Sequence, residues 1–192
     1  MSSLNNSDSA VQRLIKVSSV AVQNLAAPFD MESVGEVVAQ LDSAVMALDV
    51  SKGLPYGRYL LHNDAGGRFN IQVDVFSMDY TGAIHSHDTW GVCWILHGGL
   101  HTYDYDGTSA TLVPENYCAY GTRQSFCPVA GDWHKIRTLA RGPQPVSVHI
   151  YGQEFNLDEG TYLDGEFEPQ RGRRSAFGDD ALLRDALACG NQ

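Results

Sequence analysis

The sequence predicts an all-β barrel or sandwich that follows two short helices, and three observations support this fold class. From Tyr56 onward, apolar and polar residues alternate with the period of two that half-buried strands show. Short turn signals such as Gly98-Gly99 and Asp106-Gly107 separate the strand candidates, as in sandwiches and barrels. Before Tyr56, the apolar residues instead recur at helical spacing.

The N-terminal part, residues 1–52, is predicted to be a helical segment packed on the barrel. The stretch from Ala10 to about Ala27 is loosely amphipathic. A second stretch carries a stronger apolar stripe at helical spacing, formed by Val34, Val37, Val38, Leu41, Ala44, Val45 and Leu48. We therefore expect two helices that form a layer beside the strands.

Residues 53–155 are predicted to form the barrel, and residues 156–192 a C-terminal extension. The clearest strand spans Phe69–Val75, where strict alternation of apolar and polar residues indicates that one face is buried. The other strand candidates are 58–62, 92–96, 100–105, 110–113, 117–120, 122–126, 134–139 and 146–152. In the extension, Asp179–Ala188 is a candidate closing helix.

The charge balance argues against two classes of partner. Lys and Arg number 13 and Asp and Glu number 23, which gives a formal net charge of −10. We expect neither nucleic acid nor an anionic membrane as a partner, because both attract basic patches. The sequence shows no long apolar run, no signal peptide pattern and no disulfide framework among its cysteines. These features favour a cytoplasmic protein, which we expect to be a monomer or a weak homo-oligomer.

Seven histidines are present, and His85-Ser86-His87 is the informative pair. On a strand, residues i and i+2 point to the same face, so both imidazoles can bind one metal ion. His134 follows a Gly turn and begins a strand candidate, which an antiparallel barrel can place opposite the pair. Two surface or hydrogen-bonded histidines would show the same spacing, so the surroundings of the pair decide its interpretation.

Glycines and a proline stand in a characteristic order around these histidines. Gly82-Ala83-Ile84-His85-Ser86-His87, then Gly98, then Pro128…Gly131…His134 follow the order and approximate spacing of the two cupin motifs. The region therefore resembles the cupin superfamily, which implies a small double-stranded β-barrel (jelly roll) with a metal ion in its mouth. The glutamate ligand of the usual first motif would fall near Gly91 or Val92, and neither residue can bind metal.

Three imidazoles without a carboxylate form a neutral ligand set. Such a set suits Fe(II), Zn(II), Cu or Ni about equally by ligand softness. With Fe(II), it leaves a dipositive site with open positions, where a substrate thiolate can supply the missing negative charge beside dioxygen. The task of the protein would then be to hold sulfur and oxygen in adjacent positions.

A second informative stretch is Ser147-Val148-His149-Ile150-Tyr151-Gly152. Ser147, His149 and Tyr151 alternate with apolar residues, so they share one strand face, which we interpret as the barrel interior. Ser147 would fix the tautomer of His149, and His149 would orient the Tyr151 hydroxyl. Such a row can tune a proton near the metal, and a polar row with a purely structural role is the alternative.

Together these residues resemble the thiol dioxygenase family, which includes cysteine dioxygenase and 3-mercaptopropionate dioxygenase. Ser147 lies thirteen residues after His134, as in that family, and the resemblance runs from about Tyr56 to Gly152. It implies O2-dependent oxidation of a small thiol carboxylic acid, with cysteine favoured, to its sulfinic acid at Fe(II). The iron ligands would be His85, His87 and His134, and the catalytic residues would be Ser147, His149 and Tyr151.

The resemblance also implies a substrate-binding role for Arg58, within the stretch that begins at Tyr56, which we include in the same role. A guanidinium can hold a carboxylate by two parallel hydrogen bonds and stays charged. In 3-mercaptopropionate-type members the carboxylate arginine instead follows the tyrosine, and residues 153–161 contain no arginine. This departure favours an α-amino or otherwise substituted thiol acid, with Arg68 or Arg123 as alternative anchors.

Cys93 bears on a further property of that family. Animal cysteine dioxygenases carry a Cys–Tyr thioether, and Tyr151 matches its tyrosine. Counted from His85, the matching position is Val92, and one residue along a strand reverses the face of the side chain. We therefore expect no cross-link unless a bulge restores the register, and we expect Cys93 to act as small apolar filler.

Three hypotheses of different kinds follow from these patterns. The first is the thiol dioxygenase, with 3-mercaptopropionate or mercaptosuccinate as alternative substrates. The second is another cupin enzyme, such as a quercetinase-like dioxygenase or a sugar isomerase, against which the missing glutamate and the Ser-His-Tyr row both count. The third is a non-catalytic cupin that binds a small ligand or regulates a partner.

Overall fold

We describe the protein from a computed structural model, which places residues 9–25, 31–50, 55–82, 84–87, 89–105, 112–126, 133–152 and 161–162. Two helices precede ten strands in the described part of the chain. The helices are α1 (Ala10–Gln23) and α2 (Met31–Val45). The strands are β1 (Gly57–Asn63), β2 (Asn70–Val75), β3 (His85–Ser86), β4 (Gly91–His97), β5 (Gly99–Tyr105), β6 (Leu112–Ala119), β7 (Arg123–Phe126), β8 (Trp133–Thr138), β9 (Val146–Tyr151) and β10 (Thr161–Tyr162).

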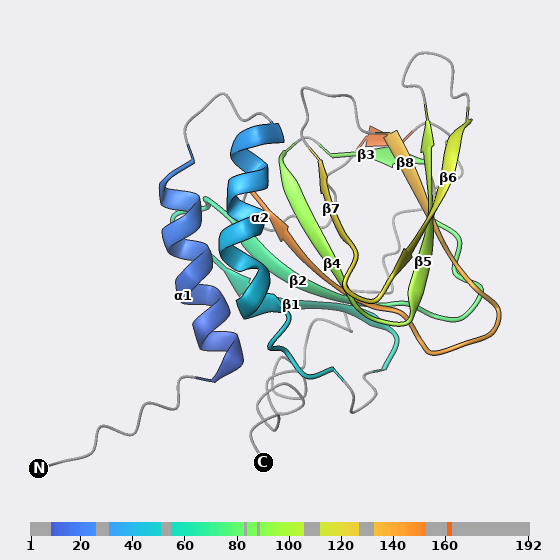
Figure 1. Ribbon diagram of the computed structural model, residues 1–192, viewed down its shortest axis with the longest axis horizontal. Coiled ribbons are helices and arrows are strands. Elements are labelled where there is room, and N and C mark those ends of the chain that lie inside the picture. Colours follow the sequence, from blue (N-terminus) through green and yellow to red (C-terminus); the bar gives the residue numbers. More distant parts are fainter. Residues whose placement is uncertain are drawn as a thin grey trace, which may run out of the picture.

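The strands form two antiparallel five-stranded sheets that face each other (Figure 1). The first sheet has the order β1-β2-β9-β4-β7, and the second sheet has the order β10-β3-β8-β5-β6. Without the edge strands β1 and β10, the two sheets have the strand orders β2-β9-β4-β7 and β3-β8-β5-β6. Consecutive strands therefore often lie in different sheets, and the chain crosses repeatedly between the two. This is the strand order of a double-sheet jelly roll, the architecture of cupins. The predicted fold class, a cupin-type jelly roll with short N-terminal helices, is confirmed.

The two helices lie side by side and cover the outer face of the first sheet (Figure 1). α1 begins with a capping box, in which Ser9 accepts from the Gln12 backbone and Gln12 accepts from the Ser9 backbone. α2 is joined to the first sheet by Asp42, which accepts hydrogen bonds from the Trp94 indole and the Arg123 guanidinium. These contacts fix the helical layer against β4 and β7.

The main hydrophobic core lies between the helices and the first sheet, outside the barrel. Helix residues such as Leu14 and Leu41 belong to the same buried cluster as Ile71, Val148 and Ile150 of the sheet. A smaller apolar cluster joins the two sheets inside the barrel, through Phe76, Ile95, Leu100 and Cys118. The large outer core leaves the inner face of the first sheet available for polar side chains.

The inner face of the first sheet is polar and buried, which corrects one expectation about β2. Asn70, Gln72 and Asp74 lie directly opposite Tyr151, His149 and Ser147, and directly opposed residues share a face of the sheet. All six residues expose less than a tenth of their surface. β2 is therefore buried on both faces, and the prediction of a half-buried strand is wrong because its polar residues face the barrel interior rather than solvent.

One strand boundary also differs from prediction. Within the described residues, the candidates 110–113 and 117–120 both contribute to one strand, β6, which pairs with β5 from Leu112 to Ala119. Pro114 and Asn116 interrupt the apolar pattern of β6, so the sequence suggests a break where the backbone ladder continues. The candidate helix Asp179–Ala188 lies outside the described residues. Neither described helix is long and apolar enough to cross a membrane.

Gly152 permits close packing beside the end of β9, and we predict a stability loss when it gains a side chain. A Cβ atom at Gly152 would overlap the indole ring of Trp90, which is 1% exposed. We expect Gly152→Ala to lower the free energy of unfolding by about 1–3 kcal/mol, measured by urea denaturation. Gly35→Ala is the matched control, because nothing lies within 4 Å of its Cβ position in α2. A Gly152→Ala protein as stable as the Gly35→Ala protein would contradict the prediction.

Candidate metal centre and polar relay

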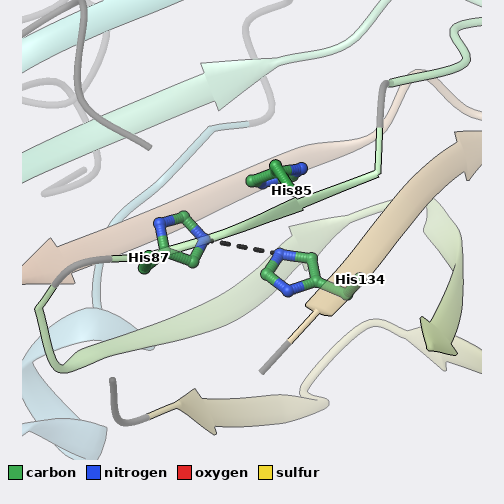
Figure 2. Close-up of side chains that lie close together, drawn as sticks. All are labelled: His85, His87 and His134. Carbon is green, nitrogen blue, oxygen red and sulfur yellow. Dashed lines mark hydrogen bonds between the residues drawn. The ribbon is translucent and has the colours of Figure 1, made fainter. Parts of the chain in front are cut away.

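His85, His87 and His134 come together where β3 and β8 of the second sheet lie side by side (Figure 2). His85 and His134 are directly opposite each other in the antiparallel pairing of these strands. His87 immediately follows β3, so its side chain lies on the same side as His85. The three imidazoles come together because His85 and His87 are close in the sequence, and His134 lies on β8, which pairs with β3.

The geometry of the three imidazoles fits one metal ion. One nitrogen from each ring lies within 4.8 Å of the other two, and the Nε2 atoms of His87 and His134 are 3.4 Å apart. Two nitrogens that bind one ion at about 2.1 Å lie about 3.0–3.4 Å apart, so this spacing is that of two ligands. All three histidines are partly buried, and no carboxylate belongs to this group within the described residues. Such an arrangement can bind a metal ion and leave coordination positions open to other ligands.

The protonation state of His87 also suits a metal ligand. Burial, and the neighbouring histidines His85 and His134, hold its pKa well below the ordinary value. The ring is therefore neutral near pH 7, and a neutral imidazole is the form that binds a metal ion. Gly91 and Val92, where the glutamate of the usual cupin motif would stand, are both buried in β4.

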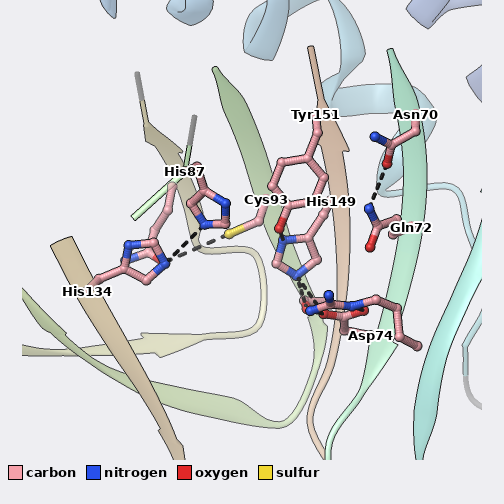
Figure 3. A network of polar contacts seen from close by, with 11 residues as sticks. Asn70, Gln72, Asp74, His87, Cys93, His134, His149 and Tyr151 are labelled. Carbon is pink, nitrogen blue, oxygen red and sulfur yellow. Dashed lines mark hydrogen bonds and ion pairs between the residues drawn. The ribbon is translucent and has the colours of Figure 1, made fainter. Parts of the chain in front are cut away.

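Ser147, His149 and Tyr151 form a continuous hydrogen-bonded row on the inner face of β9, and Figure 3 shows His149 and Tyr151 of this row. Ser147 Oγ is 2.7 Å from His149 Nε2, and the Tyr151 hydroxyl is 3.1 Å from His149 Nδ1. Burial lowers the pKa of His149 to about 4, against a smaller opposing effect of Asp74. His149 is therefore a neutral imidazole near pH 7, with one ring nitrogen donating and the other accepting.

Tyr151 links this row to the three histidines. Its ring centroid lies 5.2 Å from that of His87, and the residue is 8% exposed. The phenol hydroxyl thus lies at the boundary between the buried row and the candidate metal centre (Figure 3). The arrangement can present the Tyr151 hydroxyl to a ligand at the metal centre, while a hydrogen bond to His149 holds this hydroxyl in place.

Arg58 lies beside the row, and a carboxylate holds one edge of its guanidinium. Its Nε and Nη2 atoms each donate to an oxygen of Asp74 at 2.7 Å. Burial lowers the pKa of Arg58, but the charge and hydrogen bonds of Asp74 outweigh it, so the pKa lies above its ordinary value. The Nε and Nη2 atoms thus face Asp74, whereas the Nη1–Nη2 edge is directed away from this pair.

The other candidate anchors occupy different places. Arg68 pairs with Asp64 in the turn between β1 and β2, and Arg123 pairs with Asp42 of α2. Both arginines thus have carboxylate partners in structural positions. Tyr56 lies immediately before β1 and is 43% exposed. Its substrate-binding role stays a prediction.

Sequence reasoning missed Asp74, which joins Arg58 to the row. Asp74 is 5% exposed, and its Oδ2 atom lies 3.8 Å from His149 Nε2. Asn70 and Gln72, on the same strand, are also buried and bond to each other at 2.7 Å. The signal was present in the alternation of Asn70, Gln72 and Asp74, which has the same period as the Ser-His-Tyr row. The sequence alone does not show that the two polar rows face each other.

Cys93 faces the barrel interior, which corrects the expectation from residue counting. It lies directly opposite His149 in the pairing of β4 with β9, whereas Val92 belongs to the outer core. Its thiol lies 3.8 Å from Gln124 Oε1. Counting from His85 fails because β3 and β4 belong to different sheets, and alternation does not continue across the connection between them. The expected absence of a cross-link stays a prediction.

Several solved structures are similar to this chain at low sequence identity. No protein-family model matches the chain. A sugar phosphate isomerase of the cupin superfamily from Silicibacter pomeroyi is 15% identical, with a TM-score of 0.39 over 50% of this chain and 57% of its own. Hydroquinone 1,2-dioxygenase from Sphingomonas sp. TTNP3 is 9% identical, with a TM-score of 0.42 over 58% and 77% of the two chains.

A third similar structure, oxalate decarboxylase from Bacillus subtilis, is 12% identical with a TM-score of 0.42. The match covers 50% of this chain but only 24% of the decarboxylase, so the chain corresponds to about a quarter of that protein. The class of protein that fold and site define is a cupin-type jelly roll with a candidate three-histidine metal centre. This class rests on the strand order and on the histidine geometry described above.

Proposed function

We propose that the protein is a thiol dioxygenase, which oxidises a small thiol carboxylic acid with O2 to its sulfinic acid at mononuclear Fe(II). Cysteine is the favoured substrate. The observation that carries the proposal is an all-imidazole metal centre beside a tyrosine that is hydrogen-bonded to a buried His–Ser pair. Both atoms of O2 end on the sulfur, and the electrons that O2 gains come from the sulfur, so no separate reductant is needed.

The ligand set fits a divalent iron ion that requires a further anionic ligand. His85, His87 and His134 would hold it through three neutral nitrogens. Bound Fe(II) would supply open coordination positions and a positive charge that favours the thiolate form of the substrate. The described residues add no carboxylate to this group, so the negative charge is left for the substrate to provide.

The residues of the chain would bind and orient the substrate around this centre. Tyr151 would donate its hydroxyl hydrogen toward the reacting groups, while His149 holds the phenol in place from behind. Arg58 would bind the substrate carboxylate through its Nη1–Nη2 edge, and Tyr56 would contribute at the entrance to β1. The buried surroundings of the row would keep water from these groups.

A substrate panel tests the proposed function. We expect thiol-dependent O2 uptake with about one iron per chain, and highest kcat/KM for cysteine, when cysteine, 3-mercaptopropionate, mercaptosuccinate and cysteamine are compared in an oxygen electrode. Preference for mercaptosuccinate or 3-mercaptopropionate would correct the substrate and keep the reaction. Strong activity on cysteamine, which has no carboxylate, would refute the role of Arg58. Ligand binding without O2 uptake by the iron-loaded protein would favour a non-catalytic cupin.

The Tyr151 hydroxyl carries a separate prediction. We expect Tyr151→Phe to lower kcat by about 10²-fold while the iron content stays unchanged, because the substitution removes one donor and no metal ligand. Tyr103→Phe is the matched control, since Tyr103 lies in β5 beside His101 rather than beside the candidate centre. Equal kcat values for the two variants would show that the hydroxyl takes no part in the reaction.

A further inference from the structure

The Arg58–Asp74 ion pair lies next to the Ser-His-Tyr row, on β1 and β2, which precede β9 in the strand order of the first sheet. Arg58 is opposite Asp74 in the pairing of β1 with β2, and Asp74 is opposite Ser147 in the pairing of β2 with β9. The Asp74 side chain is 7% exposed, and both of its oxygens accept a hydrogen bond from Arg58 at 2.7 Å. A buried carboxylate therefore sits beside His149 with its charge already paired.

His149 can carry its single ring proton on either nitrogen, and the two tautomers give Tyr151 opposite roles. With the proton on Nε2, His149 would donate to Ser147 Oγ, and the Tyr151 hydroxyl would have to donate to Nδ1. With the proton on Nδ1, Ser147 donates to Nε2, His149 donates to Tyr151, and the phenol proton is left for another acceptor. Only the second arrangement lets Tyr151 donate to a ligand at the metal centre.

Two observations favour the proton on Nδ1. Ser147 is fully buried, and the described part of the structure records one hydrogen bond for its hydroxyl, to His149 Nε2. If Nε2 carried the proton, the buried Ser147 hydrogen would lack that acceptor, at a cost of about 1–3 kcal/mol. Asp74 Oδ2 lies 3.8 Å from Nε2 and, if unpaired, would draw a proton to it, but both Asp74 oxygens already accept from Arg58.

We propose that the Arg58–Asp74 ion pair is a positioning device that keeps His149 in its Nδ1–H tautomer, so that Tyr151 can donate its own proton toward the metal centre. Arg58 thus neutralises Asp74 through one edge of its guanidinium, independently of any substrate bound at the other edge. The tautomer follows from the row and the ion pair alone. Its consequence for Tyr151 rests on the proposed function.

Nitrogen-15 NMR of the histidine rings tests the tautomer directly, because protonated and unprotonated ring nitrogens differ widely in shift. The sample is the full chain loaded with Zn(II), which is diamagnetic, and the His149 signals are assigned by their loss in His149→Gln. We expect Nδ1 to be protonated and Nε2 unprotonated in the wild type. We expect Arg58→Met to protonate Nε2, and the double variant Arg58→Met/Asp74→Leu to restore the wild-type pattern.

The matched control is Arg68→Met, which breaks the ion pair with Asp64 in the turn between β1 and β2. We expect this variant to leave the His149 signals unchanged. A wild-type protein with Nε2 protonated overturns the proposal, even if Arg58→Met does not fold. Unchanged His149 signals in a folded Arg58→Met protein, or an Nε2 proton that persists in the double variant, overturn it as well.

Steady-state kinetics separate this proposal from the proposed function. If both hold, Arg58→Met lowers kcat by about tenfold and raises KM, whereas the double variant recovers kcat but keeps the raised KM, since it still lacks the carboxylate anchor. A kcat that stays low in the double variant overturns the link between the ion pair and Tyr151. A wild-type protein without thiol oxidation refutes the proposed function and leaves the NMR assignment of the tautomer standing.

Discussion

Replacing His134 by alanine is expected to remove both the bound metal and the thiol-dependent O2 uptake. His134 is the one member of the three-histidine group that comes from β8, opposite His85 in the sheet. Without it, two imidazoles from one short segment remain, and two ligands do not hold a metal ion as three do. We expect iron to fall from about one per chain to background by elemental analysis, and O2 uptake to fall with it.

The control for this substitution is His101→Ala. His101 belongs to β5 of the same sheet and is partly buried, but its ring lies against Tyr117, at a centroid distance of 5.1 Å, rather than among the three histidines. We expect His101→Ala to keep its iron and its O2 uptake. A His134→Ala protein that retained iron at the level of His101→Ala would contradict the assignment of the metal centre.

Acidification is expected to destabilise the protein through His149. Its ordinary pKa is 6.5, and burial lowers the pKa in the folded state to about 4. Between these two pH values the unfolded chain binds a proton at this residue and the folded protein does not. The free energy of unfolding therefore falls as the pH falls from 6.5 to 4, by about 3 kcal/mol in total from this residue.

Denaturant unfolding of the wild type and of His149→Gln at pH 7.5, 6.0, 5.0 and 4.0 measures this contribution. Both proteins are treated with a chelator, so that release of a metal ion does not enter the comparison. Glutamine keeps a donor and an acceptor in the buried row but has no ionisable group. We expect the stability advantage of the wild type to shrink by about 3 kcal/mol toward pH 4. Parallel stability curves for the two proteins would show that His149 titrates normally.

The strands and the histidine group were predictable because their signals are local. Alternation marks β9, turn residues mark the connection between β4 and β5, and the i, i+2 spacing of His85 and His87 places both on one face. His134 required one further step, namely that an antiparallel sheet would bring a distant strand opposite the pair. The Ser-His-Tyr row was visible for the same reason, since its three polar residues share one strand.

The features that were not predictable depend on which strands become neighbours. Asp74 looks like a solvent-facing residue of an amphipathic strand until β2 is seen to pair with β9. Cys93 was assigned to the wrong face because the chain changes sheets between β3 and β4. The inward direction of the polar face of β2 could not be inferred, because alternation alone does not say which face of a strand meets the larger apolar core.

The division of the first sheet into an apolar outer face and a polar inner face has a consequence for how such a protein can diversify. Along β9, Val146, Val148 and Ile150 support the fold, while the residues between them carry the hydrogen-bonded polar groups. Exchanges on the inner face can retune reactivity while the outer packing survives. Insertion or deletion of one residue within the strand would move the apolar residues to the inner face and the polar residues to the outer face. Changes in length are therefore tolerable in the connecting loops, and new specificities can arise by point substitution within the strands.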